Sequence, residues 1–196
     1  MASSRQFAAG FSLVEVLVSI VVLSVGLLGT ISMLLASVRT SSEAATFTAA
    51  VNLVRELSEK ARMNKGIAAE NNAANAYLVE NWRANASSGT ASADAMCVAS
   101  GAACNAVDLA AWDMSEWERR IATALPDARL SVCFDEAPWN AAAGEYTWAC
   151  SKTGHTVVVK LGWTPHAGSA KASSSSPPRL VMQLVAGQAH DGHAGS

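Results

Sequence analysis

The chain has 196 residues and a formal net charge of −2, from 14 basic and 16 acidic residues. Its length suits one domain, or a small domain with an appendage. The near-neutral charge, without a long run of either sign, excludes a basic nucleic-acid-binding surface. Hydrophobic residues make up 51% of the chain, and their uneven distribution is the main signal.

The first predicted element is an apolar membrane segment. Residues 16–38 carry no charge, and this run exceeds the about 20 residues that a helix needs to cross a bilayer. A secretory signal would have a shorter apolar region followed by a small-x-small cleavage site, and no convincing one precedes Arg39. We therefore predict that the segment stays on the protein.

The helical pattern continues beyond the apolar run. Apolar residues recur there at steps of three and four, with charged residues mostly on the opposite side: Phe47, Ala50, Val51, Val54, Leu57 and Ala61. No proline interrupts residues 11–65, and Gly66 stands where a helix end is expected. The pattern predicts one long helix whose first half faces lipid or identical surfaces and whose amphipathic half lies on a soluble domain.

The middle of the chain is predicted to be mostly loop. Residues 67–108 are rich in Ala, Asn, Ser and Gly, with a short helix expected over residues 76–82. A second helix follows, capped by Asp108 or Ser115 and ending at Pro126. Its predicted apolar face comprises Trp117, Ile121, Ala124 and Leu125.

Four strand-like runs complete the chain, at residues 130–134, 146–151, 156–163 and 179–186. Their alternating apolar residues predict an antiparallel meander. Residues 164–178 are too long and polar for a tight hairpin, and residues 187–196 are expected to be a frayed tail. The expected fold class is α+β, with a long N-terminal helix packed on a small antiparallel sheet domain.

Four cysteines follow the apolar segment: Cys97, Cys104, Cys133 and Cys150. An even number in a tethered, loop-rich domain predicts two disulfides in an oxidising compartment, with three possible connectivities. We favour the pairing of sequence neighbours, because short loops close most readily and the last two cysteines lie on candidate strands. The spacings match no usual zinc site, so no metal is expected.

No enzymatic signature accompanies these elements. The sequence lacks a Gly-rich phosphate loop, an H-E-x-x-H motif and a G-x-S-x-G motif. Glu116 and Glu118 flank Trp117 on a predicted helix and point in different directions, which suits solvated faces better than paired acid–base catalysis. We expect no catalytic residue and no cofactor.

The segment "GFSLVEVLVSIVVLSVGLLGT", which begins at Gly10, resembles the N-terminal signal of type IV pilins and pseudopilins. The resemblance implies cleavage after Gly10 by a prepilin peptidase, N-methylation of the new terminus Phe11, and a conserved role for Glu15. It also implies a pilin fold with three parts. These are a removed leader at 1–10, a transmembrane and filament-core helix at 11–38, and a periplasmic globular domain at 39–196 that includes the amphipathic half of the helix.

A physical argument gives Glu15 a purpose. A charge packed among helices is unfavourable by several kcal/mol unless it is paired. Cleavage after Gly10 creates a positive amine on Phe11, which is able to neutralise Glu15 of another subunit and so reward the correct axial register. The competing explanation is a carboxylate that reaches the lipid headgroups and has no role in assembly.

The resemblance implies a minor pilin in the inner membrane, assembled into a type IV pilus or priming it. It would thereby support biogenesis, twitching or adhesion at the cell surface. Its expected partners are major and minor pilins, the prepilin peptidase, the inner-membrane assembly platform and the membrane before assembly, with no nucleic acid. The alternatives are a minor pseudopilin of a type II secretion system and a monomeric membrane-anchored binding module with an unprocessed N-terminus.

Overall fold

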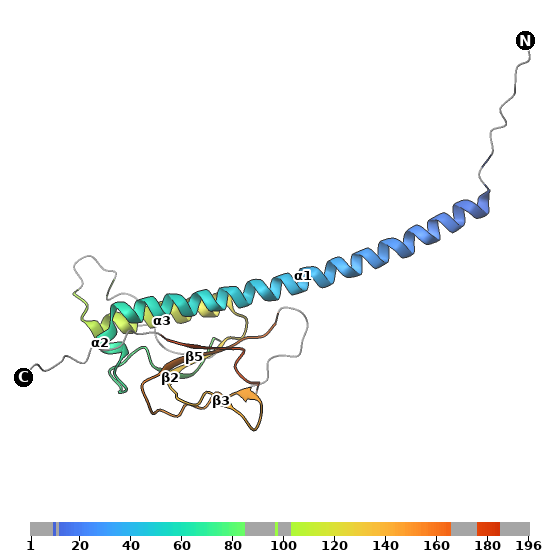
Figure 1. The fold of residues 1–196 in the computed structure, drawn as a ribbon. Helices are drawn as coiled ribbons and strands as arrows, with labels where there is room; N and C mark the ends of the chain where they lie inside the picture. Colours follow the sequence, from blue (N-terminus) through green and yellow to red (C-terminus); the bar gives the residue numbers. More distant parts are fainter. Residues whose placement is uncertain (1–9, 11, 85–96, 98–102, 166–175, 185–196) are drawn as a thin grey trace, which may run out of the picture. The chain divides into compact units, whose positions relative to one another are not determined.

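The computed structural model describes residues 10, 12–84, 97, 103–165 and 176–184 (Figure 1). The chain divides into two compact units, Met1–Ser42 and Glu43–Ser196. Helix α1, Leu13–Met63, supplies residues to both. Each unit is described separately below, beginning with the second, which contains the sheet and the core.

Helix α1 is close to the predicted length but ends differently from the prediction. It stops at Met63, and a single further turn, α2 at Lys65–Ala68, follows. Gly66 lies inside α2, so the prediction that it ends the long helix is wrong. The buried face of α1 in this unit matches the amphipathic pattern and comprises Ala50, Leu53, Val54, Leu57 and Ala61.

Helix α3, Ala106–Ala124, begins with a capping box. The Asn105 side chain accepts hydrogen bonds from the backbone N–H groups of Val107 and Asp108, both at 2.9 Å, while the Asp108 carboxylate accepts one from the Asn105 N–H at 3.4 Å. The prediction of Asp108 or Ser115 as the cap is therefore wrong. Asp108 instead occupies the third helical position of the box.

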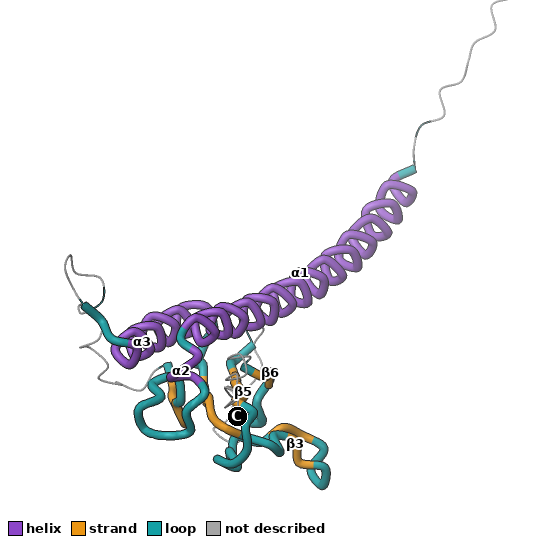
Figure 2. The backbone as a smooth tube through the Cα atoms, turned by 60° about the vertical axis from the view of Figure 1, so that its left-hand side comes forward, coloured by secondary structure: helices purple, strands orange, loops and turns teal. Residues whose placement is uncertain are grey.

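The main sheet has four antiparallel strands in the order β1-β2-β5-β6. Their bounds are Val79–Arg83, Arg129–Phe134, Val157–Gly162 and Leu180–Gln183. The neighbours β2, β5 and β6 form the predicted meander, and Figure 2 shows these strands lying below the helices.

Strand β1 replaces the short helix that was predicted over residues 76–82. The Asn75 side chain accepts a hydrogen bond from the Tyr77 N–H at 3.0 Å, which forms a local turn instead of a helical start. Val79 and Trp82 then pair with β2 and pack against the core. Tertiary pairing thus overrides a weak local helical pattern.

The run at 146–151 is also not a strand of the main sheet. Only its first residue, Tyr146, is in a strand, where β4 (Glu145–Tyr146) pairs with β3 (Trp139–Asn140) in a separate hairpin. Residues 147–152, which we call the strap, have no regular structure. The strap is joined to β2 and β5 by hydrogen bonds and by a disulfide. The side chains of these two strands are buried on both faces of the sheet.

The core lies between the sheet and the pair formed by α3 and the second half of α1. Figures 1 and 2 both show α3 beside that part of α1. The Trp117 indole, which is fully buried, donates a hydrogen bond to the Leu53 carbonyl at 2.8 Å. On α3, Ile121 and Leu125 are buried as predicted, whereas Ala124 is exposed. The α+β architecture, with a long helix packed on a small antiparallel sheet, is confirmed.

Candidate functional site

The candidate site is the start of α1, where the sequence places the processing motif. Gly10 is exposed and a side chain added there would meet no atom within 4 Å. Ser12 begins the helix: its hydroxyl accepts a hydrogen bond from the Val14 N–H at 3.3 Å. Its carbonyl accepts from the N–H groups of Glu15 and Val16 at 3.0 and 3.2 Å. Phe11, the predicted new terminus, lies outside the described residues.

Glu15 lies in the first turn of α1 and is exposed. A carboxylate at this position interacts favourably with the partial positive charge at the helix N-terminus, typically by about 0.3–1 kcal/mol. Within the described residues, the structure contains no ion pair of Glu15. The helix start therefore stabilises the charge without neutralising it.

The large apolar side chains that follow Glu15 are exposed on the surface of the first unit. Over residues 13–38 the exposed fraction of the large hydrophobic side chains ranges from 47% for Val16 to 90% for Leu13. This stretch belongs to a helix long and apolar enough to cross a membrane. An apolar surface of this extent requires lipid or other apolar surfaces as its surroundings.

Several hydroxyl side chains within this stretch bond to the backbone of the helix itself. Four hydroxyl groups donate to carbonyls three or four residues earlier, at 2.7–3.0 Å: Ser19, Ser24, Thr30 and Ser32. In a medium without water each unpaired polar group costs several kcal/mol. These internal bonds make the surface compatible with an apolar environment.

One shallow groove runs along the same stretch of helix. It is lined by Glu15, Val16, Ser19, Ile20 and Leu23. The apolar walls suit side chains from another helix, and the carboxylate at one end suits a cation. This combination of an apolar groove with one acidic end is what the predicted contact between subunits requires.

In the second unit, a polar network fixes the helix pair. The Lys60 ammonium donates to Asp113 and Glu116 at 2.9 and 3.0 Å, and the Tyr77 hydroxyl donates to the other oxygen of Asp113 at 3.0 Å. Burial acts to lower the pKa of Lys60, but the bonds to the two carboxylates outweigh it and raise that pKa. The network holds α1 against α3.

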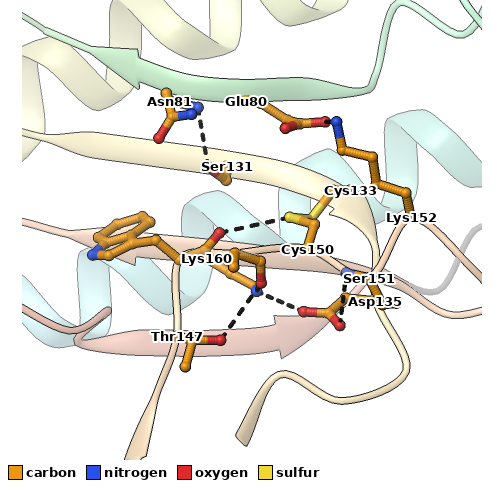
Figure 3. The surroundings of a disulfide bond; sticks show 12 residues. Glu80, Asn81, Ser131, Cys133, Asp135, Thr147, Cys150, Ser151, Lys152 and Lys160 are labelled. Carbon is orange, nitrogen blue, oxygen red and sulfur yellow. Dashed lines mark hydrogen bonds and ion pairs between the residues drawn. A yellow bond between two sulfur atoms is a disulfide. The ribbon is translucent and has the colours of Figure 1, made fainter. Parts of the chain in front are cut away.

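The four cysteines form two disulfides, Cys97–Cys104 and Cys133–Cys150. This is the pairing of sequence neighbours favoured above. The second disulfide joins β2 to the strap (Figure 3). Beside it the Lys160 ammonium, fully buried, donates to Asp135 and to the Ala149 carbonyl, both at 2.6 Å.

The surroundings of Asp135 shift the pKa of this buried carboxyl group. Burial acts to raise this pKa, but the hydrogen bond from Lys160, supported by the backbone N–H groups of Ala137 and Ser151, lowers it below its ordinary value. Sequence reasoning did not identify this pair. A lysine in the otherwise apolar run "TVVVKLGW" was the available signal, because a charge inside a buried strand requires a partner.

Residues 5–37 match a family described as the prokaryotic N-terminal methylation motif. The matched segment contains Gly10, Phe11 and Glu15 and extends to within one residue of the end of the apolar run. Comparisons with curated proteins and with solved structures gave no match to the chain.

Proposed function

We propose that the chain is a minor pilin. The N-terminal methylation motif supports a type IV pilin-like protein, and proteins of this class are structural and not catalytic. In this proposal the prepilin peptidase cuts after Gly10, Phe11 is N-methylated, and the mature subunit enters or primes a type IV pilus. The stretch "VGLLG" at residues 25–29 and the C-terminal strands most resemble the pilus modification protein PilV.

The observation that carries the proposal is a contrast within the first unit. The start of helix α1 is polar, whereas the surface of the helix that follows is apolar. Exposed Gly10 is accessible to a protease, and the capped helix begins two residues after Phe11. The exposed apolar segment that follows, residues 13–38, contains a single carboxylate, that of Glu15. A pure membrane anchor has no use for this charge, whereas an assembling helix uses it to select its register.

The selection works through the cost of an unpaired charge. In the correct register the new amine of Phe11 on one subunit meets Glu15 of a neighbour, while in other registers both charges remain buried without partners. Breaking a buried pair typically costs about 3–5 kcal/mol. This cost is large compared with the change in free energy of the apolar contacts, because that energy changes little when one apolar helix slides along another.

The remaining features support a periplasmic globular domain before assembly. Two disulfides form and persist in an oxidising compartment, and the apolar half of α1 suits a single-pass anchor in the inner membrane. Partners would then be major and minor pilins through α1, together with the assembly platform. Co-purification with other minor pilins or with a secretion apparatus separates the pilus from the type II secretion alternative.

The experiment compares two glutamates on the same helix. We expect Glu15→Ala to reduce the amount of subunit in sheared filaments by roughly tenfold or more, since each 1.4 kcal/mol is a factor of about ten. Glu43→Ala, at an exposed position outside the apolar run, is the matched control and should incorporate normally. Equal incorporation of both variants would contradict the proposal.

A further inference from the structure

The outer face of the main sheet is buried, although helices α1 and α3 pack on the other face. Side chains alternate between the two faces along a strand, and those of β2 and β5 on the outer face are at most 4% exposed: Ser131, Cys133, Val158 and Lys160. An antiparallel sheet commonly leaves such a face in water. Here the strap, residues 147–152, crosses the face and covers part of it (Figure 3).

Neutral contacts hold the strap at both of its ends. The Trp148 ring lies over Gly162, where an added Cβ would come within 2.9 Å of the indole, and its N–H donates to the Ser176 carbonyl at 2.7 Å. At the other end the Lys152 N–H donates to the Phe134 carbonyl at 3.0 Å. Each of these hydrogen bonds adds only a modest net stabilisation, because water replaces it when the strap leaves.

The strap also buries a charge. The Lys160 ammonium donates to Asp135 and to the Ala149 carbonyl of the strap, both at 2.6 Å, and the two side chains of this ion pair are 0% and 1% exposed. Asp135 is fixed to the sheet independently of the strap, since its N–H donates to the Thr156 carbonyl at 2.9 Å. Removal of the strap would therefore leave the pair in place and admit water to it. Because the desolvation cost of a buried ion pair offsets its attraction, this pair does not favour docking of the strap.

A disulfide supplies the covalent tie. It joins Cys133 of β2 to Cys150 of the strap, and a dithiol reductant opens such a bond by thiol–disulfide exchange. The first thiolate of the reductant attacks the sulfur of Cys150, which is partly exposed, and Cys133 leaves as a thiolate that takes up a proton. The second thiol of the reductant then displaces Cys150, so the reductant becomes a disulfide and both cysteines become thiols.

We propose that the strap is a redox-sensitive cover of the sheet. While the Cys133–Cys150 disulfide is intact, the strap stays docked and the pair of Lys160 and Asp135 stays buried. When the disulfide is reduced, the strap leaves and both charged groups return to water. Disulfides persist in oxidising compartments and are reduced in the cytosol. The docked strap therefore marks a chain that has reached an oxidising compartment, and this property does not depend on assembly into a filament.

Alkylation of the reduced full chain in a non-ionic detergent tests the cover. The chain is reduced with dithiothreitol, freed of the reductant and treated with iodoacetamide, and mass spectrometry locates the modified cysteines. Cys133 is 3% exposed in the docked state, so its alkylation rate follows the fraction of chains with an open strap. Cys97 and Cys104, which are half-buried and lie outside the strap, give the reference rate.

A neutral double variant separates the buried charges from the cross-link. In Asp135→Asn combined with Lys160→Met, the asparagine oxygen still accepts from the N–H groups of Ala137 and Ser151, as Asp135 does. Replacing a buried ion pair by neutral groups of similar size is often neutral or stabilising, so the strap of this variant should stay docked after reduction. Its Cys133 should be alkylated roughly tenfold more slowly than that of the wild type. Equal rates overturn the proposal.

The matched control removes the exposed pair that also joins the strap to the sheet. Lys152 contacts Glu80 at 3.0 Å, with side chains that are 66% and 45% exposed, and a pair of this kind contributes little. Lys152→Met combined with Glu80→Gln should therefore leave Cys133 as reactive after reduction as it is in the wild type. Slow alkylation in this variant as well would assign the effect to surface charge and overturn the role of the buried pair.

Hydrogen exchange of the wild type gives a second test, which needs no variant to fold. The Lys152 N–H, bonded to the Phe134 carbonyl, should be protected in the oxidised chain and lose its protection on reduction. The backbone amides of β2 and β5 should stay protected in both states, because the sheet remains folded. Retained protection at Lys152 after reduction, or loss of protection throughout the sheet, overturns the proposal.

Discussion

Both halves of helix α1 carry large apolar side chains, but these side chains have opposite surroundings in the two halves. In the second unit its apolar face packs against α3 and the sheet, and Leu57 and Val54 are fully buried. In the first unit the large apolar side chains are at least 47% exposed. Helical backbone is continuous from Leu13 to Met63, so the difference lies in what the side chains contact.

This contrast separates two sources of stability. Burial of the second half contributes to the folding of one chain, because each buried leucine or valine contributes about 1.5–3 kcal/mol relative to an exposed one. The first half contributes nothing of this kind within the chain. Its apolar surface becomes favourable only when it contacts lipid or neighbouring helices, which is the behaviour expected of a membrane-inserted assembly segment.

The largest predicted effect is on the buried pair of the second unit. Lys160→Ala leaves the Asp135 charge buried without its partner, and we expect it to lower the free energy of unfolding by about 3–5 kcal/mol. The measurement is urea unfolding of the full chain in non-ionic detergent, followed by tryptophan fluorescence. All six tryptophans lie after residue 43, so the signal reports on this unit.

The matched control is the neighbouring surface pair. Lys152 contacts Glu80 at 3.0 Å, and its side chain is 66% exposed. An exposed pair of this kind contributes little, about 0–1 kcal/mol, so Lys152→Ala should unfold nearly as the wild type does. A similar loss for the two lysines would refute the role assigned to burial.

A second prediction uses two leucines of the same helix. Leu57→Ala should lower the free energy of unfolding by about 2–5 kcal/mol, because it leaves a cavity in the core. Leu17, at 64% exposure, should change it by no more than about 0.5 kcal/mol when replaced by alanine. If Leu17→Ala destabilised the fold as much as Leu57→Ala, the contrast between the two halves would be wrong.

A third, smaller effect concerns pH. Burial raises the pKa of Glu118 from its ordinary 4.5 to about 7, partly opposed by a hydrogen bond from Trp82. The folded chain then binds more protons than the unfolded chain between these values, so the free energy of unfolding should fall as pH rises from about 4.5 to 7. The expected loss is on the order of 2 kcal/mol.

The Glu118 contribution is isolated by substitution. Glu118→Gln keeps a neutral side chain of the same shape and should flatten the decline in unfolding free energy between pH 5 and 7. Glu59→Gln, at a position with 67% exposure, should retain the wild-type slope. An unchanged slope in Glu118→Gln would assign the pH dependence to other groups.

The elements set by strong periodic patterns could be predicted from the sequence. The apolar run and the amphipathic repeat at Val54 and Leu57 define α1, and the alternation at residues 130–134 and 157–161 defines the central strands. Sequence-neighbour pairing also gave the two disulfides, since short loops limit the choices. The fold class follows from these elements together.

The remaining features depend on contacts that no local pattern encodes. Strand β1 forms because Val79 and Trp82 find partners on β2, about fifty residues later. Asn105 caps α3 in place of the predicted Asp108 or Ser115, because its side chain accepts hydrogen bonds from two backbone N–H groups. At the candidate site, the motif gave Gly10, Phe11 and Glu15, while the pairing of Glu15 depends on a second subunit and stays a prediction.

The most direct test of the account is the mass of the mature N-terminus. Subunits from sheared filaments, digested and analysed by mass spectrometry, should begin at N-methylated Phe11, and a strain without the prepilin peptidase should retain the leader in the membrane. Filament subunits that still carry Met1 or Ala2 would contradict the account, because the Phe11 nitrogen would then be a peptide amide and not an amine that pairs with Glu15.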